Sequence, residues 1–432
     1  MASLSLPKPF LSLFLLSLFP FFAQALVPLN ETFKYVNQGS FGDYIVEYDG
    51  NYRVLRPFAS PFQLCFYNIT PNAFTLALRM GIQRTESLFR WVWEANRGNP
   101  VRENATLTFG QDGNLVLADA DGRIAWRTNT SNKGGVGFRL LSNGNMVLYD
   151  SKGKFIWQSF DYPTDTLLVG QSLQLKGPNK LVSRASETDN SAGPYSFIFE
   201  PKRFALYFKS PNSPKQYVYY DSTQRFGQSN VVSENVTLTS EVDAAYSYIY
   251  LTYPNGGSQV LARPKYNATS SFLRIDLDGN LRVYTYYAEV DSGGAWEETF
   301  ILFDRDSSWE TECQLPSRCG KFGLCEDNQC VACPSPNGLT GWSKNCEPKK
   351  VTSCAAQDVY YYKVEGVDHF ISKYNKGESI KVDACGNKCT KDCKCLGYFY
   401  NTASSRCWIA YDLKTLTKVA NSTHLGFIKA PK

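Results

Sequence analysis

The chain has 432 residues, with 45 lysines and arginines against 40 aspartates and glutamates, so its formal net charge is +5. This balance provides no basic stripe, which excludes a nucleic-acid-binding protein of the usual kind. The length predicts three or four domains rather than one.

The first 25 residues have the pattern of a secretory signal peptide. Lys8 supplies the positive start, residues 10–22 are mostly apolar, and Ala23-Gln24-Ala25 fits a small-x-small cleavage site. The apolar run is shorter than the roughly 20 residues that a helix needs to cross a bilayer. We therefore expect residues 1–25 to be removed and the mature chain to be secreted, without a membrane span.

Seven Asn-x-Ser/Thr sequons are candidate N-glycosylation sites in a secreted chain. Each of their asparagines should lie on the surface, and we expect most of them to carry glycans. The seven are Asn30, Asn68, Asn104, Asn129, Asn235, Asn267 and Asn421.

Residues 33–303 contain short runs rich in Val, Leu, Tyr, Phe and Thr, separated by Asp-Gly and Asn-Gly turns. These runs predict β-strands, and sustained helical periodicity is missing. Two segments repeat at a distance of 31 residues: 113–117 (GNLVL) followed by Trp126, and 144–148 (GNMVL) followed by Trp157. Trp93 marks a third unit. We expect the three indoles to meet on a shared axis and fill a core.

The 13 cysteines divide the chain into two parts, because Cys65 is the only one before Cys313. We expect residues 26 to about 310 to be held by a hydrophobic core and the last part by disulfides, with zinc as the less favoured explanation. For Cys65 we predict a buried thiol; an intermolecular disulfide that makes a dimer is the alternative. Cys385, Cys389 and Cys393 repeat every four residues, which on a helix places them along one face.

Several of these motifs resemble known families. Residues 91–101 (WVWEANRGNPV), the two repeats and residues 157–167 (WQSFDYPTDTL) resemble bulb-type mannose-binding lectins and S-locus glycoproteins. Residues 278–282 (DGNLR) and 319–325 (CGKFGLC) resemble S-locus glycoproteins, and the last cysteines resemble a PAN/apple domain. The order of modules is similar to that of the plant EP1-like secreted glycoproteins over nearly the whole mature chain.

The resemblance implies an all-β fold in four modules. They are a bulb-type lectin domain over 26–165, built as a β-prism II of three four-stranded sheets, a second lectin-like or S-locus glycoprotein-like β domain over 166–310, an EGF-like module over 311–348, and a small α+β PAN/apple domain over 352–432. It also implies glycans or glycoproteins as partners, a protein partner for the PAN/apple domain, and a recognition or signalling role in the cell wall or apoplast.

The bulb-type lectin pocket reads Gln-x-Asp-x-Asn-x-Val-x-Tyr, and alternate residues of a strand share one face. Three degenerate versions occur, and we expect mannose-type binding at one or more of them. The candidate residues are Asp112, Asn114 and Val116 in the first; Asn143, Asn145, Val147 and Tyr149 in the second; and Asp278, Asn280 and Tyr284 in the third. The alternative is that these residues only build turns and strands, and that the chain is an adaptor that binds proteins.

The segment ahead of Cys313 shows no acidic cluster of the calcium-binding EGF type. The resemblance further implies six disulfides. The implied pairs are Cys313–Cys325, Cys319–Cys330, Cys333–Cys346, Cys354–Cys393, Cys385–Cys407 and Cys389–Cys395.

Catalytic signatures are scarce. The two histidines, His369 and His424, lie in no Gly-x-Ser-x-Gly or His-Glu-x-x-His motif, so triad and zinc hydrolases lose support. A glycosidase needs only two carboxylates and stays an alternative. We expect a protein that is not an enzyme and that uses no cofactor and no metal.

Overall fold

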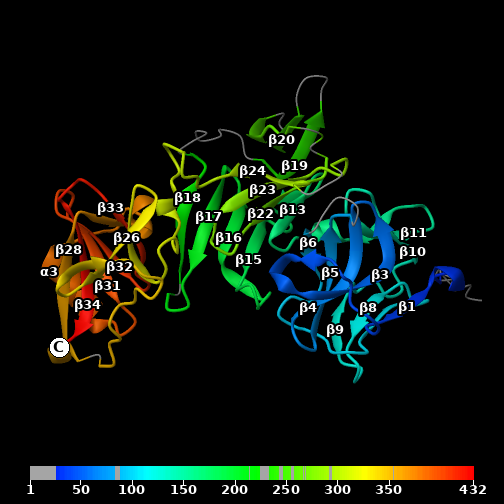
Figure 1. Cartoon of the computed structure of the whole chain (residues 1–432), viewed down its shortest axis with the longest axis horizontal. Helices are drawn as coiled ribbons and strands as arrows, with labels where there is room; N and C mark the ends of the chain where they lie inside the picture. Colours follow the sequence, from blue (N-terminus) through cyan, green and yellow to red (C-terminus); the bar gives the residue numbers. More distant parts are fainter. Residues whose placement is uncertain are drawn as a thin grey trace, which may run out of the picture.

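The structure is a computed structural model, and it describes residues 26–82, 88–213, 215–223, 233–242, 247–253, 257–265, 267, 269–290, 294–353 and 355–432. The expected signal peptide, residues 1–25, lies outside these ranges. Three β-rich bodies follow one another along the long axis in chain order, from blue to red (Figure 1). The all-β fold is confirmed: strands dominate the described ranges, and the α-helices described over their whole length are short, α2 (Phe370–Lys373) and α3 (Val382–Lys391).

The first body, which we call the first prism, contains three sheets. One has five strands, in the order β2 (Ile45–Val46), β6 (Leu88–Glu94), β5 (Ala73–Met80), β4 (Phe62–Thr70) and β3 (Asn51–Ala59). The second has four, in the order β1 (Phe33–Val36), β7 (Thr106–Phe109), β8 (Leu115–Ala118) and β9 (Ile124–Arg127). The third has three, β10 (Gly135–Leu140), β11 (Met146–Asp150) and β12 (Phe155–Gln158).

The sheet sizes of the first prism differ from the three sheets of four strands that we expected. The five-stranded sheet gains β2, which pairs in parallel with β6. Among the described residues the third sheet has no fourth strand, and after β12 the chain makes a 3-10 turn at Ser159–Asp161 and enters the second body.

The three indoles meet in the core of the first prism, as the repeat predicts. Trp93, Trp126 and Trp157 come from β6, β9 and β12, so each sheet contributes one. Their ring centroids are 5.8, 6.3 and 5.8 Å apart, and all three pairs meet edge to face. This geometry suits the quadrupoles of aromatic rings, so the predicted indole cluster is confirmed.

The second body, the second prism, has the regular arrangement of three four-stranded sheets around its own core. One sheet runs β13 (Thr166–Leu168), β22 (Ser271–Ile275), β23 (Leu281–Tyr286) and β24 (Trp296–Ile301). Another runs β14 (Ser172–Gln174), β19 (Asn235–Val242), β20 (Ser247–Thr252) and β21 (Ser258–Ala262). The last runs β15 (Lys180–Arg184), β16 (Ala192–Glu200), β17 (Arg203–Lys209) and β18 (Gln216–Asp221).

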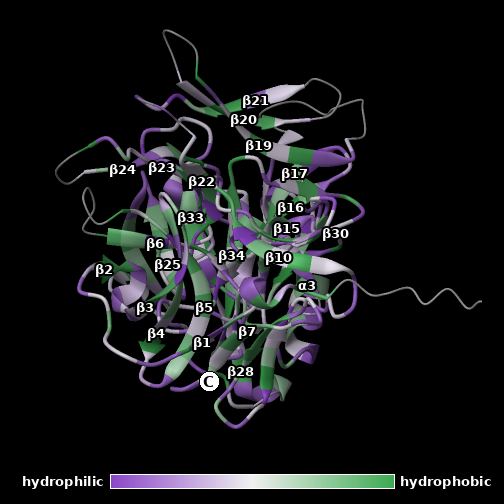
Figure 2. Cartoon of the chain, turned by 90° about the vertical axis from the view of Figure 1, so that its right-hand side faces the viewer, coloured by the Kyte–Doolittle hydropathy of each residue, from purple (hydrophilic) through white to green (hydrophobic). Residues whose placement is uncertain are grey.

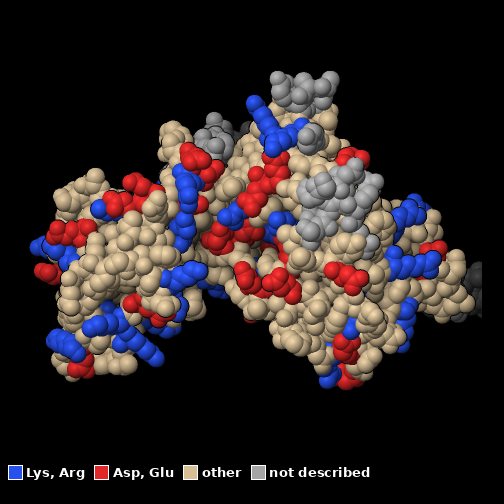
Figure 3. All heavy atoms as spheres, viewed as in Figure 1, with Lys and Arg blue, Asp and Glu red and all other residues tan. Residues whose placement is uncertain are grey.

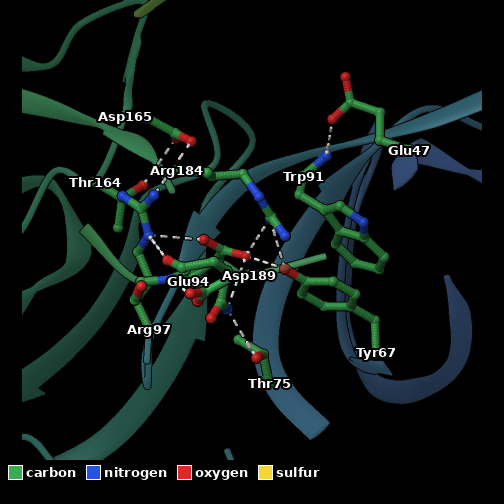
Figure 4. Close-up of polar contacts among 12 residues, drawn as sticks. Glu47, Tyr67, Thr75, Trp91, Glu94, Arg97, Thr164, Asp165, Arg184 and Asp189 are labelled. Atoms are coloured by element: carbon green, nitrogen blue, oxygen red, sulfur yellow. Dashed lines mark hydrogen bonds and ion pairs between the residues drawn. The ribbon is translucent and has the colours of Figure 1, made fainter. Parts of the chain in front are cut away.

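Buried ion pairs join the two prisms. Arg184 of β15 lies at the centre of the group drawn in Figure 4, and its side chain is 2% exposed. Its Nη1 atom donates to Glu94 Oε1 at 2.9 Å and to the Tyr67 hydroxyl at 2.8 Å, both in the first prism. Arg97 bridges Glu94, at 3.1 Å, and Asp165, at 3.8 Å. The charges therefore compensate one another where water is excluded.

A second buried pair lies beside the first. Arg274 of β22 donates from Nη1 to Glu47 at 2.9 and 3.2 Å and from Nη2 to the carbonyl of Trp91. Glu47 also pairs with Arg90, at 2.6 Å, and accepts from the Trp91 amide at 3.0 Å. Arg274 is 2% exposed and Glu47 is 7% exposed, so the orientation of the two prisms is fixed by interactions that require both partners.

The C-terminal body contains two five-stranded sheets. The first runs β27 (Gly338–Gly341), β26 (Gln329–Ser335), β25 (Phe322–Glu326), β33 (Lys414–Lys418) and β29 (Val367–His369). The second runs β28 (Val359–Glu365), β34 (His424–Pro431), β31 (Gly397–Asn401), β32 (Arg406–Ala410) and β30 (Glu378–Ser379). Strands β25 and β33 pair in parallel. One sheet therefore includes residues from both cysteine-rich segments, 311–348 and 352–432.

In this body, the disulfides whose two cysteines both lie in the described residues are pairings that the family resemblance implies. They are Cys313–Cys325, Cys319–Cys330, Cys333–Cys346, Cys385–Cys407 and Cys389–Cys395. The sixth implied pair involves Cys354, which lies outside the described residues.

We expected Cys385, Cys389 and Cys393 to lie along one face of a helix, and this expectation is wrong for Cys393. Cys385 and Cys389 lie buried on α3, but the helix ends at Lys391, before Cys393. Asp392 has an extended backbone, with φ −105° and ψ 110°, and therefore stops the helix.

Cys65 lies on β4 and is fully buried. Burial raises the pKa of its thiol to about 12, so the sulfur stays protonated at neutral pH. The prediction of a buried thiol is confirmed, and a second chain does not reach this sulfur in the folded protein.

The surface is mixed in character. Hydrophobic and hydrophilic segments alternate along the strands in Figure 2, as expected for strands with one buried face. Acidic and basic side chains are interspersed on the coloured part of the face in Figure 3. In the part of the chain that the structure describes, helices are too short and polar to cross a membrane.

The expectation that each sequon lies on the surface is wrong for Asn68. Asn68 is 5% exposed because it lies on β4, between β3 and β5, and lines a cavity of about 190 Å³ with Asp189 and Asn190 of the second prism. Little of the Asn68 side chain is therefore accessible for a glycan. Asn235 is half-buried, and the exposed asparagines are Asn30, Asn104, Asn129, Asn267 and Asn421.

Candidate carbohydrate-binding sites

The first site lies on the turn before β8 and on that strand. Asp112 is exposed, and its Oδ1 atom accepts from the Asn114 amide at 3.2 Å. Gly113, at φ 76°, provides the left-handed backbone that the turn requires. Leu115 and Leu117 point into the core, whereas Val116 is half-buried on the opposite face.

Asn114 faces inward and is 8% exposed. Its Oδ1 atom accepts from Thr128 Oγ1 at 3.0 Å and from the Thr130 amide at 3.1 Å. Among the described residues, its Nδ2 atom has no protein acceptor, so this donor is available to a ligand. The first site therefore retains a carboxylate, an amide donor and an apolar contact.

The second site is filled by the protein itself. Asn145 is 3% exposed, and its Nδ2 atom donates to Gln158 Oε1 at 2.9 Å. Val147 is 1% exposed and has no surface left for a sugar. Arg139, opposite Val147 on β10, lies with its guanidinium carbon 5.1 Å from the centre of the Tyr149 ring. The turn residue of this site, Asn143, remains exposed.

The third site is closed by Arg282, which stands where the lectin pattern has valine. Its guanidinium donates to Asp276 Oδ2 at 2.9 Å and to Asp278 Oδ2 at 2.7 Å. The Tyr284 hydroxyl donates to the same Asp276 oxygen at 3.0 Å. Asn280 is 1% exposed and bonds to the backbone of Phe303 through both amide atoms. The polar groups of this site therefore satisfy one another.

The three asparagines share a structural role that sequence reasoning missed. In each site the Oδ1 atom accepts from a backbone amide that follows the neighbouring strand: Thr130, Phe160 or Phe303. Sequence spacing shows that the asparagine recurs, but the acceptor role becomes visible only when the strands are paired. Ser131, which donates to the Asp112 carboxylate, is a further residue of the first site that spacing did not reveal.

Asp119 anchors the far end of the hairpin that carries the first site. Its carboxylate accepts from the amides of Arg102 and Ala120, each at 2.9 Å, from Arg102 Nε at 3.0 Å, and from Arg123 Nη2 at 3.2 Å. Burial alone would raise the pKa of this carboxyl, but these donors hold it at about 2, below its ordinary 3.8.

This pKa predicts how stability depends on pH. A carboxyl whose pKa is lower in the folded chain stabilises the fold above its unfolded pKa, and this contribution disappears as the pH falls through the folded pKa. We expect the free energy of unfolding to fall between about pH 4 and pH 2, with a shallower fall for Asp119→Asn, in urea titrations. Asp150→Asn, at the equivalent turn of the next repeat, is the control; equal slopes for wild type and Asp119→Asn would contradict the assignment.

Comparison with known proteins agrees with these observations. Residues 90–186 match the family described as D-mannose binding lectin. EP1-like glycoprotein 4 of Arabidopsis thaliana is 51% identical over 426 residues, which cover 97% of this chain and 96% of that protein. The epidermis-specific secreted glycoprotein EP1 of Daucus carota is 56% identical over 367 residues, covering 80% and 94%. A solved monomeric mannose-binding lectin from Gastrodia elata is 21% identical and covers 30% of this chain and 96% of its own, with a TM-score of 0.17.

The two long matches extend over most of this chain and over nearly the full length of both relatives. The lectin-like character inferred from the repeats is confirmed by the match of residues 90–186 to the D-mannose binding lectin family. The chain belongs to the family of EP1-like glycoproteins.

Proposed function

We propose that this protein is a secreted, non-enzymatic recognition protein of the cell wall or apoplast that binds mannose-type glycans weakly through its first site. One observation carries the proposal: Asp112, the Nδ2 atom of Asn114 and Val116 are open to a ligand, whereas side chains of the protein fill the second and third sites. The match of residues 90–186 to the mannose-binding lectin family supports the sugar class, and the name of the carrot relative supports secretion.

The binding should be weak because two positions of the lectin pattern are missing. Gly110 and Ala118 stand where the pattern has glutamine and tyrosine. Each lost hydrogen bond costs about 1 kcal/mol, or about fivefold in affinity. A surface that carries many glycans compensates for a weak single site through multivalency.

Asp112→Ala tests the first site directly. We expect wild type to be retarded on mannose-agarose and released by methyl-mannoside, and Asp112→Ala to lose at least about tenfold in affinity, since a charge-assisted hydrogen bond contributes about 1.5–3 kcal/mol.

The matched control is Asn143→Ala, which removes the equivalent turn side chain from the filled second site and should leave retention unchanged. Absence of retention together with a flat glycan array would contradict mannose binding.

A second function is favoured by the filled sites. If the lectin surfaces serve proteins rather than sugars, the chain acts as an extracellular adaptor through its prisms and its C-terminal body. Competition separates the two functions, because methyl-mannoside displaces a partner held by the first site and leaves a protein partner of the adaptor in place.

A further inference from the structure

The sequon Asn129-Thr130-Ser131 forms one wall of the first site. The Thr130 amide donates to Asn114 Oδ1 at 3.1 Å, and its hydroxyl donates to the carbonyl of Gly113 at 2.7 Å. The Ser131 hydroxyl donates to the carboxylate of Asp112. Both residues that follow Asn129 are therefore bonded to residues that the sugar would contact or that shape the turn beneath it.

Asn129 itself is exposed and held in place by its neighbours. Thr128 and Thr130 are 6% and 1% exposed, and their hydroxyl oxygens lie 2.7 Å apart against Asn114. Asn129 has a φ of 56°, in the left-handed region that asparagine tolerates. Its side chain therefore projects from a segment whose neighbours on both sides are anchored at the site, so the attachment point of a bulky glycan is held beside the site.

We infer that an N-linked glycan on Asn129 partly covers the first site, so that the site is more accessible in chains that lack this glycan. The modification joins Asn129 Nδ2 to the anomeric carbon of a sugar from a glycosyl-diphosphate lipid donor; the amide loses one proton and the lipid diphosphate leaves. The identity of the excluded ligand rests on the proposed function, whereas the covering of Asp112 does not.

Other sequons provide matched controls. Asn421 is exposed in the C-terminal body, away from the first prism. Asn30 is the sharper comparison, because the nearby Val27 amide donates to the carbonyl of Gln111 at 3.0 Å and brings the N-terminal segment to the same turn. If the inference holds, removing only the Asn129 glycan is enough to uncover Asp112.

The experiment uses the full chain secreted by a cell that performs N-glycosylation. Peptide mass spectrometry gives the occupancy of Asn129, and carbodiimide labelling of carboxylates gives the accessibility of Asp112. We expect severalfold more labelling of Asp112 in Asn129→Gln than in wild type, and no change in Asn421→Gln or Asn30→Gln. Asn129→Gly is a second variant, because glycine adopts positive φ without strain.

Two results would overturn the inference: an unoccupied Asn129 in the secreted protein, or equal labelling of Asp112 in wild type and in both Asn129 variants. Mannose-agarose then separates the inference from the proposed function. Stronger retention of Asn129→Gln supports both. Uncovered Asp112 without retention supports the covering and contradicts mannose binding.

Discussion

Replacing Arg184 with methionine should lower the free energy of unfolding by about 3–5 kcal/mol, because it leaves a buried carboxylate with too little compensation. Glu94 is 5% exposed and would keep Arg97 while losing the guanidinium at 2.9 Å. Since Arg184 and Glu94 come from different prisms, the loss should appear at their interface. Urea unfolding combined with hydrogen exchange of peptides from β6 and β15 measures it.

Two variants control for the effect of charge alone. Glu378→Gln removes an exposed ion pair with Lys388, in which both side chains are about half exposed, and should cost at most about 1 kcal/mol. Arg184→Met combined with Glu94→Gln should cost less than the sum of the single changes, because the charge left behind is removed. Additive costs would show that the pair contributes nothing specific.

Replacing Trp157 with alanine should cost about 3–5 kcal/mol in the stability of the first prism. Its indole is 6% exposed, meets the other two indoles edge to face and stacks on Tyr162 with ring centroids 5.8 Å apart. Removing it opens a cavity on the axis where the three sheets meet. The tryptophan signal in near-ultraviolet circular dichroism should weaken together with this stability.

Trp309 provides the matched control, since its side chain is 78% exposed. Trp309→Ala should change stability by no more than about 0.5 kcal/mol. Equal effects of the two replacements would mean that the indole cluster does not hold the first prism together.

The indole cluster was predictable from the sequence because it follows from a repeat. Units of about 31 residues place one tryptophan in each sheet, and sheets that pack on one another bring equivalent positions together. The buried ion pairs were not predictable in this way. Arg184 and Glu94 are 90 residues apart and Arg274 and Glu47 are 227 apart, and each belongs to a different unit, so no period relates them.

The positions of the candidate sites were predictable from the sequence, but whether each site is open or filled by protein side chains was not. Spacing located Asp112, Asn143 and Asp278 on equivalent turns. It could not show that Arg282 folds back on two carboxylates, because that depends on side-chain direction across paired strands. The sequon at Asn68 likewise could not show that this residue is buried, because its burial depends on how strands and the second prism pack around it.

The parallel pairing of β25 with β33 sets an order for the maturation of the C-terminal body. Strand β33 begins at Lys414 and ends at Lys418, so the sheet that includes β25 is completed only after these residues have been synthesised. Until then the edge of β25 is unpaired, and Phe322 and Leu324 lack neighbours such as Leu416. An unpaired edge is prone to association with other chains. Strand β25 therefore depends on β33, which lies far along the chain, to cover its edge and its buried side chains.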